Sequence, residues 1–360
     1  MTTILRLLVP MSVLGGSIAA QQAPVGPQST RPSPISESEL VRRLSSAVDS
    51  LAKRGEFSGV VVLAKNGAPV FQRAYGMADR ERSIANNLET AFNLGSINKA
   101  FTQIAILQLS AAGKLDLDST LAAYWPDYPN KAVANKITIR QLMRHTSGIG
   151  GNIFDSPVGG TRHEVRNLKD YLALFVNAPP QFEPGTSNAY SNAGYVVLGL
   201  LIERLSGQDY YTYVRDHIFE PAGMTRTGSF FVDSLPVNTA IGYTTGREQS
   251  PPGTPLHPNT LELPGRGSSA GGGYSTAEDL LRFLKALREH RIQNGLPAGL
   301  GIAGGSGGIN GVVEGSLPGG YDVVVLANLD PPAAERVARM TRGWLGVKDD
   351  DGPGPRRPRR

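Results

Sequence analysis

Ser96 and Lys99 are the residues whose types and spacing most directly indicate chemistry. They lie three positions apart, immediately before the apolar run Ala100–Ala112. If that run is a helix, the hydroxyl and the amine are one turn apart on one face. A serine hydroxyl becomes a useful nucleophile when a base takes its proton, and a lysine can be that base where burial or a neighbouring cation lowers its pKa. The positive potential of the helix N-terminus would lie beside a reacting carbonyl, so the pair predicts acyl transfer through a serine.

The spacing alone is not specific, because Ser50 and Lys53 are also three positions apart. That second pair lies late in the predicted helix Glu37–Lys53, and we interpret it as part of a solvated helix face. Ser96 instead follows an extended segment, 90–94, and would open its helix. A serine that only caps the helix N-terminus is the alternative interpretation of Ser96.

Tyr190 and Asn192 form the second group of candidate residues. They stand in a loop directly before a helical run that begins near Ala193. From such a loop a phenol can project into a cleft, and it could relay a proton if Lys99 lowered its pKa. The Asn192 amide can both donate and accept, so it can hold Lys99 or a substrate carbonyl. The same Tyr-x-Asn spacing at 128–130 contains proline in a Pro-rich loop, and we interpret it as a turn.

The surrounding pattern predicts an α/β (α+β) fold, in which an antiparallel sheet is flanked by helices and carries an inserted, mostly helical lobe. Near the N-terminus the helix Glu37–Lys53 precedes two strands, Gly59–Ala64 and Val70–Ala74, joined by a turn at 65–67. The chain ends with two more strands and a helix: Asn310–Glu314, Tyr321–Asn328 and Pro332–Leu345. Between these ends, helices alternate with Gly/Pro-rich loops: Ile139–Arg144, Leu168–Asn177, Ala193–Leu205, Gln208–Ile218 and Ser275–Glu289. A sheet built from both ends of the chain would place a catalytic cleft between sheet and lobe.

Composition excludes several other classes of function. The 360 residues contain no cysteine, which removes thiol catalysis, disulfides and cysteine-ligated metals. The five histidines are far apart without the spacing of metal ligands, so we expect no metal and no cofactor. The net charge is +5, but the basic residues are scattered and no nucleic-acid-binding signature occurs. We therefore expect a small-molecule ester, amide or peptide as the partner, and no nucleic acid.

Both ends of the chain are predicted to lie outside the folded domain. Residues 1–19 contain Arg6, then an apolar stretch, then small residues of the kind that precede a signal-peptide cleavage site. This pattern indicates a signal peptide, and therefore a periplasmic or secreted protein. An uncleaved N-terminal anchor is the alternative, and beyond the export signal we expect no membrane contact. Residues 20–36 are typical of a flexible linker and 347–360 of a disordered tail, so one domain would cover 37–346.

Taken together, the motifs resemble the serine β-lactamase-like family of class C β-lactamases, D-alanyl-D-alanine carboxypeptidases, D-aminopeptidases and related esterases. Five segments of this chain resemble family segments and occur in the same order: 93–99, 113–118, 141–148, 190–195 and 270–280. The resemblance covers residues 37–346 and implies the β-lactamase/transpeptidase-like fold. It also implies catalytic roles for Ser96, Lys99 and Tyr190, with Asn192 orienting the amine and the substrate.

The third family motif is altered in this chain. The family usually carries Lys or His, then a small residue and Gly, on an edge strand. Placing the motif at 302–309 keeps Gly304 and Gly305 but puts Ile302 at the cation position, and a register shifted by three residues also lacks a cation. The resemblance implies that the Gly305 amide pairs with the Ser96 amide as an oxyanion hole, while a positive partner for a substrate carboxylate is lost. We therefore expect weak β-lactam hydrolysis and a neutral ester or amide substrate; a glycine-rich loop without a catalytic role is the alternative.

His145 lies in the family-like segment 141–148, directly after a predicted helix. A histidine can serve as the base of a Ser-His-Asp triad. The resemblance instead implies that His145 belongs to a structural turn.

Two functions are compatible with these residues. The first is an exported serine hydrolase, in which Ser96 attacks an ester or amide carbonyl, Lys99 and Tyr190 form the base system, and water releases the acyl-enzyme. The second is a non-catalytic binding or scaffold protein that retains the penicillin-recognising fold, and Ile302 motivates it. The intact group of Ser96, Lys99, Tyr190 and Asn192 favours the enzyme, because a binding module has no physical need for all four. The sequence leaves open which group is the base and what the oligomeric state is.

Overall fold

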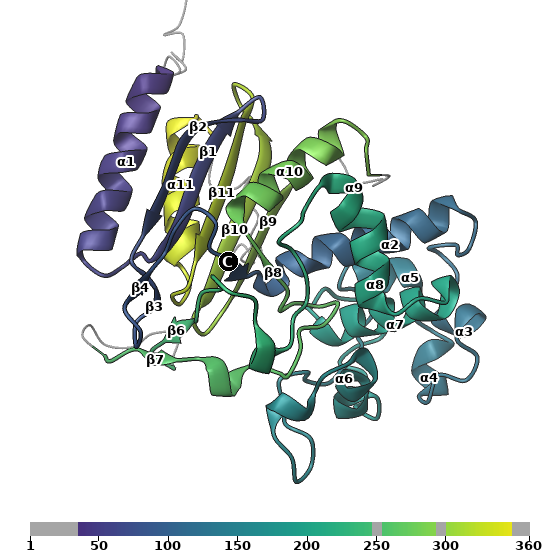
Figure 1. Cartoon of the computed structure of the whole chain (residues 1–360). Helices are drawn as coiled ribbons and strands as arrows, with labels where there is room; N and C mark the ends of the chain where they lie inside the picture. Colours follow the sequence, from purple (N-terminus) through teal and green to yellow (C-terminus); the bar gives the residue numbers. More distant parts are fainter. Residues whose placement is uncertain (1–34, 247–253, 293–299, 348–360) are drawn as a thin grey trace, which may run out of the picture. The chain divides into compact units, whose positions relative to one another are not determined.

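The centre of the fold is a five-stranded antiparallel sheet in the order β2-β1-β11-β10-β9 (Figure 1). The computed structural model describes residues 35–246, 254–292 and 300–347. The strands of this sheet are β1 (Gly59–Lys65), β2 (Ala68–Tyr75), β9 (Gly301–Ser306), β10 (Ile309–Leu317) and β11 (Tyr321–Ala327). Because β1 pairs with β11, the two ends of the described chain meet in the middle of the sheet, as the sequence pattern predicts.

The β1–β2 hairpin is set by its turn residues. Asn66 and Gly67 both have positive φ, 52° and 82°, which is the conformation that a two-residue hairpin turn requires. Asparagine and glycine adopt it at the lowest steric cost. The turn predicted at 65–67 is therefore confirmed, and it places Lys65 opposite Ala68; a register shift between Leu63 and Ala64 then brings Leu63 opposite Phe71.

Helices cover both faces of the sheet (Figure 1). The helices α1 (Glu37–Lys53) and α11 (Ala333–Trp344) pack on one face, and α10 (Ala277–Arg288) packs on the other. Side chains alternate along β1, so that Val61 joins the apolar cluster under α1 and α11, while Val62 joins the larger cluster that continues into the helical lobe. Burial on both faces explains why β1 is a continuous apolar run.

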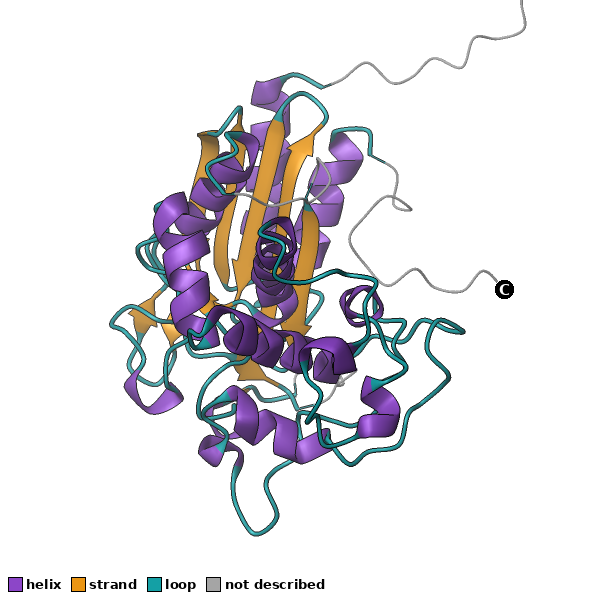
Figure 2. Cartoon of the chain, turned by 90° about the vertical axis from the view of Figure 1, so that its right-hand side faces the viewer, coloured by secondary structure: helices purple, strands orange, loops and turns teal. Residues whose placement is uncertain are grey.

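The helical lobe lies in the chain between two short strands, β5 (Phe92–Asn93) and β8 (Tyr274–Ser275), which pair with each other. Its central helix α7 is buried along the run Ala193–Ile202 and packs against α2, α5, α6 and α8. In Figure 2 these helices lie in front of and below the strands. The lobe helices are α2 (Asn98–Ala111), α3 (Leu121–Tyr124), α4 (Lys131–Ala134), α5 (Ile139–Met143), α6 (Leu168–Phe175), α7 (Asn192–Ser206), α8 (Tyr210–Val214) and α9 (Glu220–Ala222). The remaining short strands pair as β3 (Met77–Asp79) with β4 (Ile84–Ala85), and β6 (Tyr243–Thr244) with β7 (His257–Pro258).

The predicted fold class is confirmed, with two local differences. The expected helix Gln208–Ile218 is divided into α8 and a π-helical turn, Arg215–Phe219. The strand β9 was expected only from the family resemblance, since a segment with so many glycines shows no alternation of apolar and polar residues. The predicted signal peptide, 1–19, and most of the predicted linker and tail lie outside the described residues. In the described ranges, none of the helices has both the length and the apolar character needed to span a membrane.

Candidate active site

Ser96 lies in a 3₁₀ turn, Gly95–Ile97, that leads directly into α2. Its hydroxyl forms a hydrogen bond with the Tyr190 hydroxyl, and its Oγ lies 3.1 Å from Lys99 Nζ. The N-cap position of α2 is held by Ile97, without a side-chain capping bond. The simple capping interpretation of Ser96 is therefore wrong, because its hydroxyl faces the other candidate residues instead of the free amides of the helix.

Lys99 is a buried amine in the first turn of α2, with only 4% of its surface exposed. Its Nζ donates hydrogen bonds to Asn192 Oδ1 at 2.7 Å and to the Ala270 carbonyl oxygen at 2.5 Å. No carboxylate forms an ion pair with it in the part of the chain that the structure describes. Burial therefore lowers the pKa of Lys99 to about 7, and the neutral amine is well populated near neutral pH.

Tyr190 and Asn192 are positioned by the N-terminus of α7. Ser191 caps this helix by accepting a hydrogen bond from the Gly194 amide at 3.1 Å, which places Tyr190 just before the cap and Asn192 just after it. Tyr190 is 56% exposed, but its hydroxyl is directed inward onto Ser96. Partial burial raises the pKa of Tyr190, so the condition set for a proton relay, a pKa lowered by Lys99, is not met. The phenol therefore keeps its proton at neutral pH.

His145 supports the loop that carries Tyr190. Its Nδ1 accepts a hydrogen bond from the Ser191 amide at 3.1 Å, and its ring packs against Tyr190 with 4.6 Å between ring centroids. Burial and then the nearby Lys99 lower the pKa of His145 to about 4, so the ring is neutral and able to accept at Nδ1. These contacts agree with a structural turn, and they add that the turn holds a candidate catalytic side chain.

The glycines of β9 lie against the Ser96 turn. A Cβ on Gly304 would lie 2.3 Å from the Leu94 carbonyl oxygen and 2.7 Å from the Ser96 nitrogen, so no side chain fits there. The Gly305 nitrogen lies 3.1 Å from the point that a Cβ on Gly95 would occupy. The strand thus brings its backbone against the backbone of the Ser96 turn, the close approach that an oxyanion hole formed by the Ser96 and Gly305 amides would require.

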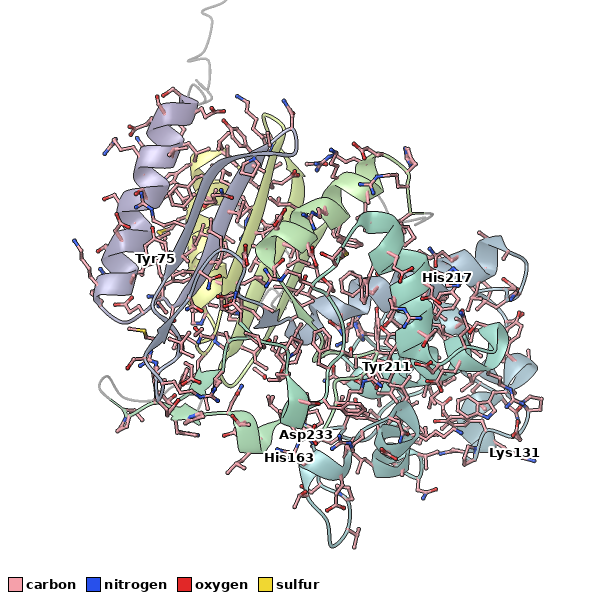
Figure 3. All side chains as sticks on the ribbon, in the orientation of Figure 1. Tyr75, Lys131, His163, Tyr211, His217 and Asp233 are labelled. Atoms are coloured by element: carbon pink, nitrogen blue, oxygen red, sulfur yellow. The ribbon has the colours of Figure 1, made fainter. Side chains whose placement is uncertain are left out.

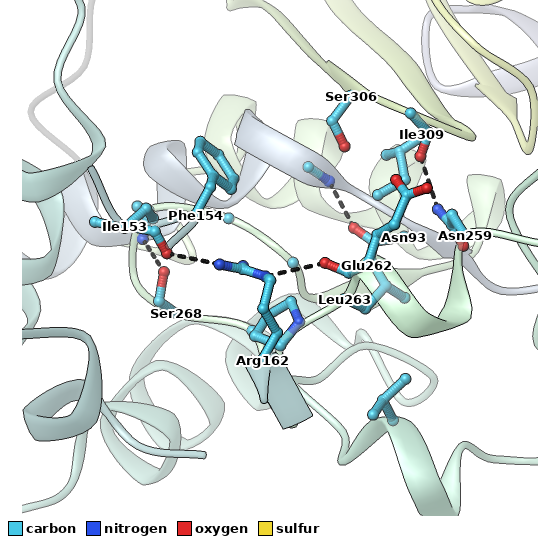
Figure 4. A pocket seen from close by; sticks show the side chains of 18 of the residues that line it. Asn93, Ile153, Phe154, Arg162, Asn259, Glu262, Leu263, Ser268, Ser306 and Ile309 are labelled. Atoms are coloured by element: carbon cyan, nitrogen blue, oxygen red, sulfur yellow. Dashed lines mark hydrogen bonds between the residues drawn. The ribbon is translucent and has the colours of Figure 1, made fainter. Parts of the chain in front are cut away.

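A cleft of about 640 Å³ opens in front of these groups, as the close-up in Figure 4 shows. Ser96, Asn192 and Gly305 form part of its lining, and loop residues such as Arg162 and Leu263 form the opposite part. Ile302 is not one of its described lining residues; its side chain is half-buried and packs against the larger apolar cluster. The position at which the family usually has a cation is therefore part of the core packing in this chain.

Comparison with known sequences agrees with this geometry. The sequence model of the family described as Beta-lactamase matches residues 44–325, which is most of the chain. The chain belongs to the beta-lactamase family. The family match and the relatives described below both identify it as a serine hydrolase.

Three relatives show how similar the chain is to other members of the beta-lactamase family. Esterase EstB from Burkholderia gladioli is 30% identical over 346 residues, covering 87% of this chain and 86% of that protein. PbpX from Bacillus subtilis, named as a penicillin-binding protein, is 34% identical over 245 residues. The matched region covers 68% of this chain but only 58% of PbpX. A solved penicillin-binding protein from Bacillus halodurans superposes with a TM-score of 0.72 at 31% identity, over 82% of this chain and 98% of that one.

The beta-lactamase-family site contains no metal centre among the residues that the structure describes. No group of three or more His, Asp or Glu side chains is arranged to hold a metal ion in those ranges. Figure 3 shows His163 beside the loop that carries Asp233, and His217 elsewhere on the helical lobe. His163 binds the Thr260 carbonyl oxygen at 2.9 Å, which is a structural contact.

Sequence reasoning found the four side chains that meet here but missed two of their supports. The structure brings Ser96, Lys99, Tyr190 and Asn192 into one cluster, with Gly304 and Gly305 beside it. The two missed supports are the carbonyl of Ala270 and the ring of His145. Both residues lie in segments that resemble the family, so the sequence did mark these positions. A motif identifies a position, however, and does not reveal which of its atoms contacts the catalytic side chains.

Proposed function

We propose that this chain is an exported hydrolase that cleaves an ester or amide bond through an acyl-enzyme on Ser96. One observation carries the proposal: the Ser96 hydroxyl is held between a buried, unpaired amine and a protonated phenol. A weak nucleophile in contact with a base and a proton donor is what acyl transfer through serine requires. No cofactor is needed for this chemistry.

Lys99 is the better candidate for the base. A neutral amine has two N–H groups and one lone pair, and the two N–H groups are used by Asn192 Oδ1 and the Ala270 carbonyl. The lone pair is then left for Ser96 Oγ, 3.1 Å away. Lys99 takes the serine proton as Oγ bonds to the substrate carbonyl carbon. Asn192 therefore orients the base as well as lying in the cleft.

Tyr190 acts as the acid toward the leaving group. Its raised pKa keeps the phenol protonated, so it can donate a proton to the departing oxygen or nitrogen, and the proton that Lys99 took from Ser96 then returns to the phenolate. The negative charge that develops on the carbonyl oxygen is stabilised by the Ser96 and Gly305 amides. Water then attacks the acyl-enzyme, with Lys99 again taking the proton, and the products are a carboxylic acid and free Ser96.

The relatives support an ester or amide substrate without naming it. One is called an esterase and two are called penicillin-binding proteins. The third motif of this chain offers no cation at Ile302, which supports weak β-lactam hydrolysis. The N-terminal pattern supports export to the periplasm or medium.

A non-catalytic binding protein is the competing proposal. It would need the altered third motif to have removed turnover while the fold remained. The cluster around Ser96 favours the enzyme, because a binding site gains nothing from a lysine whose pKa burial lowers to about 7 beside a serine hydroxyl.

Labelling with a fluorophosphonate serine probe, followed by intact-mass measurement, distinguishes the two proposals. We expect one adduct on the wild-type protein and none on Ser96→Ala. Ser50→Ala is the matched control, since Ser50 has the same spacing to a lysine on a solvated helix and should leave labelling unchanged. Turnover of short-chain p-nitrophenyl esters with little turnover of nitrocefin completes the expected result. A folded sample with neither adduct nor turnover would establish the binding protein instead.

A further inference from the structure

Arg162 is a cation of the cleft that no catalytic role uses. It lies in a 3₁₀ turn, Arg162–Glu164, on the lobe side, opposite the glycines of β9. Figure 4 shows its side chain reaching across the cleft lining, below Phe154. The guanidinium lies 5.6 Å from the centre of the Phe154 ring. Lys99, by comparison, is buried behind Ser96 and donates to protein acceptors.

The hydrogen bonds of Arg162 leave one nitrogen unused. Nε donates to the Glu262 carbonyl oxygen at 3.0 Å, and Nη1 donates to the carbonyl oxygens of Ile153 and Asp155, each at 3.1 Å. A guanidinium has five N–H groups, so these three bonds leave the two on Nη2, which bond to none of the described residues. The three backbone acceptors therefore fix the plane of the guanidinium and direct Nη2 without neutralising its charge.

Arg162 also forms no direct ion pair with a carboxylate of the described residues, although the charge of Asp155 acts on it from nearby. No ion pair involves it within the described ranges, although most other arginines of the helical lobe, such as Arg140 and Arg204, have one. The nearest acid on the same lining, Glu262, offers Arg162 its backbone oxygen, while its carboxylate lies 3.3 Å from His257. Burial lowers the pKa of Arg162, and the smaller opposing effects of Tyr171 and of the Asp155 carboxylate do not offset it. Among the described residues that line the cleft, Arg162 is the single cationic side chain.

We infer that Nη2 of Arg162 binds a carboxylate carried by the substrate, a role that rests on the proposed hydrolase function. A half-buried, pre-oriented and unpaired guanidinium in a cleft favours an anion. A carboxylate fits better than a phosphate dianion, because one nitrogen with one positive charge is free. The cation missing at Ile302 on the sheet side is thus replaced, for substrate recognition, by one on the lobe side. The substrate class is an ester or amide that also bears a carboxylate, in place of the neutral substrate expected from the third motif alone.

Matched ester pairs test this inference on the full-length protein. The first pair is the p-nitrophenyl ester of adipic acid with its second carboxyl free or methylated, and the suberic pair repeats it at greater length. A further pair, 4-acetoxybenzoate and its methyl ester, places the carboxylate on the leaving group. We expect kcat/KM to favour the free carboxylate about tenfold or more in at least one pair. The pair with the largest ratio reports on which side of Ser96, and how far away, the cation acts.

Variants then assign the preference to Arg162. Arg162→Gln should reduce the ratio toward one, and Arg162→Lys, which keeps the charge, should retain part of it. Arg204→Gln is the control, because Arg204 also binds a backbone carbonyl of the lobe but lies outside the cleft lining, and it should keep the full ratio. If Arg162→Gln fails to fold, the test rests on the wild-type ratios of kcat/KM, free acid over methyl ester. Ratios near one in every pair overturn the inference.

Failure of the hydrolase proposal would look different. It would appear as no turnover of either member of any pair. Calorimetry on Ser96→Ala with adipic acid monomethyl ester and dimethyl adipate would then test the site directly. Tighter binding of the acid, lost in Ser96→Ala combined with Arg162→Gln, would support a carboxylate site, and equal binding of both compounds would overturn it.

Discussion

The two walls around Ser96 are built in different ways. On the lobe side, α2 and the loop before α7 present functional side chains, Lys99 and Tyr190, within hydrogen-bonding distance of the hydroxyl. On the sheet side, the part of β9 that lies against the Ser96 turn presents backbone, because Gly304 and Gly305 leave no room for side chains. In the proposed mechanism the first wall transfers protons, and the second stabilises the negative charge on the carbonyl oxygen.

This difference determines how each wall can fail. A side-chain wall fails when one functional group is removed, while the surrounding fold is retained. A backbone wall fails when something is added, because a single methyl group would collide with the Ser96 turn. The comparison is therefore tested by substitutions that remove a functional group from the lobe side and by substitutions that add a methyl group on the sheet side.

The largest effect is expected from Lys99→Met. Loss of the base should lower kcat/KM for p-nitrophenyl esters by about 10³-fold, within the range for general base catalysis. Methionine fills the buried position with apolar atoms, but it leaves Asn192 Oδ1 and the Ala270 carbonyl without their donor. Lys53→Met is the control, since Lys53 is exposed at the end of α1 and has the same spacing to a serine. Retention of more than a tenth of the activity by a folded Lys99→Met would remove Lys99 from the role of base.

Gly304→Ala should have the next largest effect. The added Cβ would lie 2.3 Å from the Leu94 carbonyl oxygen, so β9 must move away from the Ser96 turn. We expect kcat to fall about 100-fold, comparable to the loss of one oxyanion donor, together with a loss of about 1–3 kcal/mol of stability.

Gly343→Ala is the matched control for that substitution. Gly343 is an exposed position in α11 where an added Cβ would meet no atom within 4 Å, so alanine should preserve activity and stabilise the helix by up to about 1 kcal/mol. Full activity in Gly304→Ala, measured as kcat and melting temperature side by side, would show that β9 does not form the oxyanion wall.

The same contrast explains what the sequence could reveal. Side-chain chemistry is visible as residue types at fixed spacing, so Ser96, Lys99, Tyr190 and Asn192 could be named from the sequence alone. The helix α1 was equally visible, because Leu40, Leu44, Val48 and Leu51 repeat at helical spacing. A sheet built from both ends of the chain followed from the apolar runs there, and the β1–β2 hairpin followed from the Asn66–Gly67 turn, but the pairing of β1 with β11 was not predicted.

What the sequence could not reveal depends on three-dimensional surroundings. From the sequence, Lys99 could have lowered the pKa of Tyr190, whereas in the structure burial raises it. Burial is a property of the packed loop and cannot be taken from the local motif. Arg162 belongs to no motif, and only its three backbone acceptors show that Nη2 is left without a hydrogen-bond partner among the described residues. Gly305 could be aligned, but its distance from the Ser96 turn could not.

The pH dependence separates the two side chains of the lobe wall. With Lys99 as the proposed base, activity requires the neutral amine, whose pKa is about 7, so kcat/KM should rise with pH and level off above that value. Between pH 8 and pH 6 the loss is about tenfold, since protonation removes the base in proportion. Tyr190→Phe should lower the plateau but keep the same midpoint. If the midpoint instead disappeared in Tyr190→Phe, the titrating base would be the phenol.

The smallest effect is expected at His145, which contacts the lobe wall from behind. His145→Ala removes the acceptor of the Ser191 amide and the ring against Tyr190, and we expect kcat to fall about fivefold, the equivalent of one neutral hydrogen bond. His145→Asn should recover part of this loss, because asparagine tolerates the positive φ of 60° and can accept at the same amide. The midpoint of the pH profile should stay unchanged in both variants, since the pKa of His145 is about 4 and its ring is already neutral where Lys99 titrates. A shift of that midpoint, or a loss as large as that of Lys99→Met, would instead make His145 part of the base system.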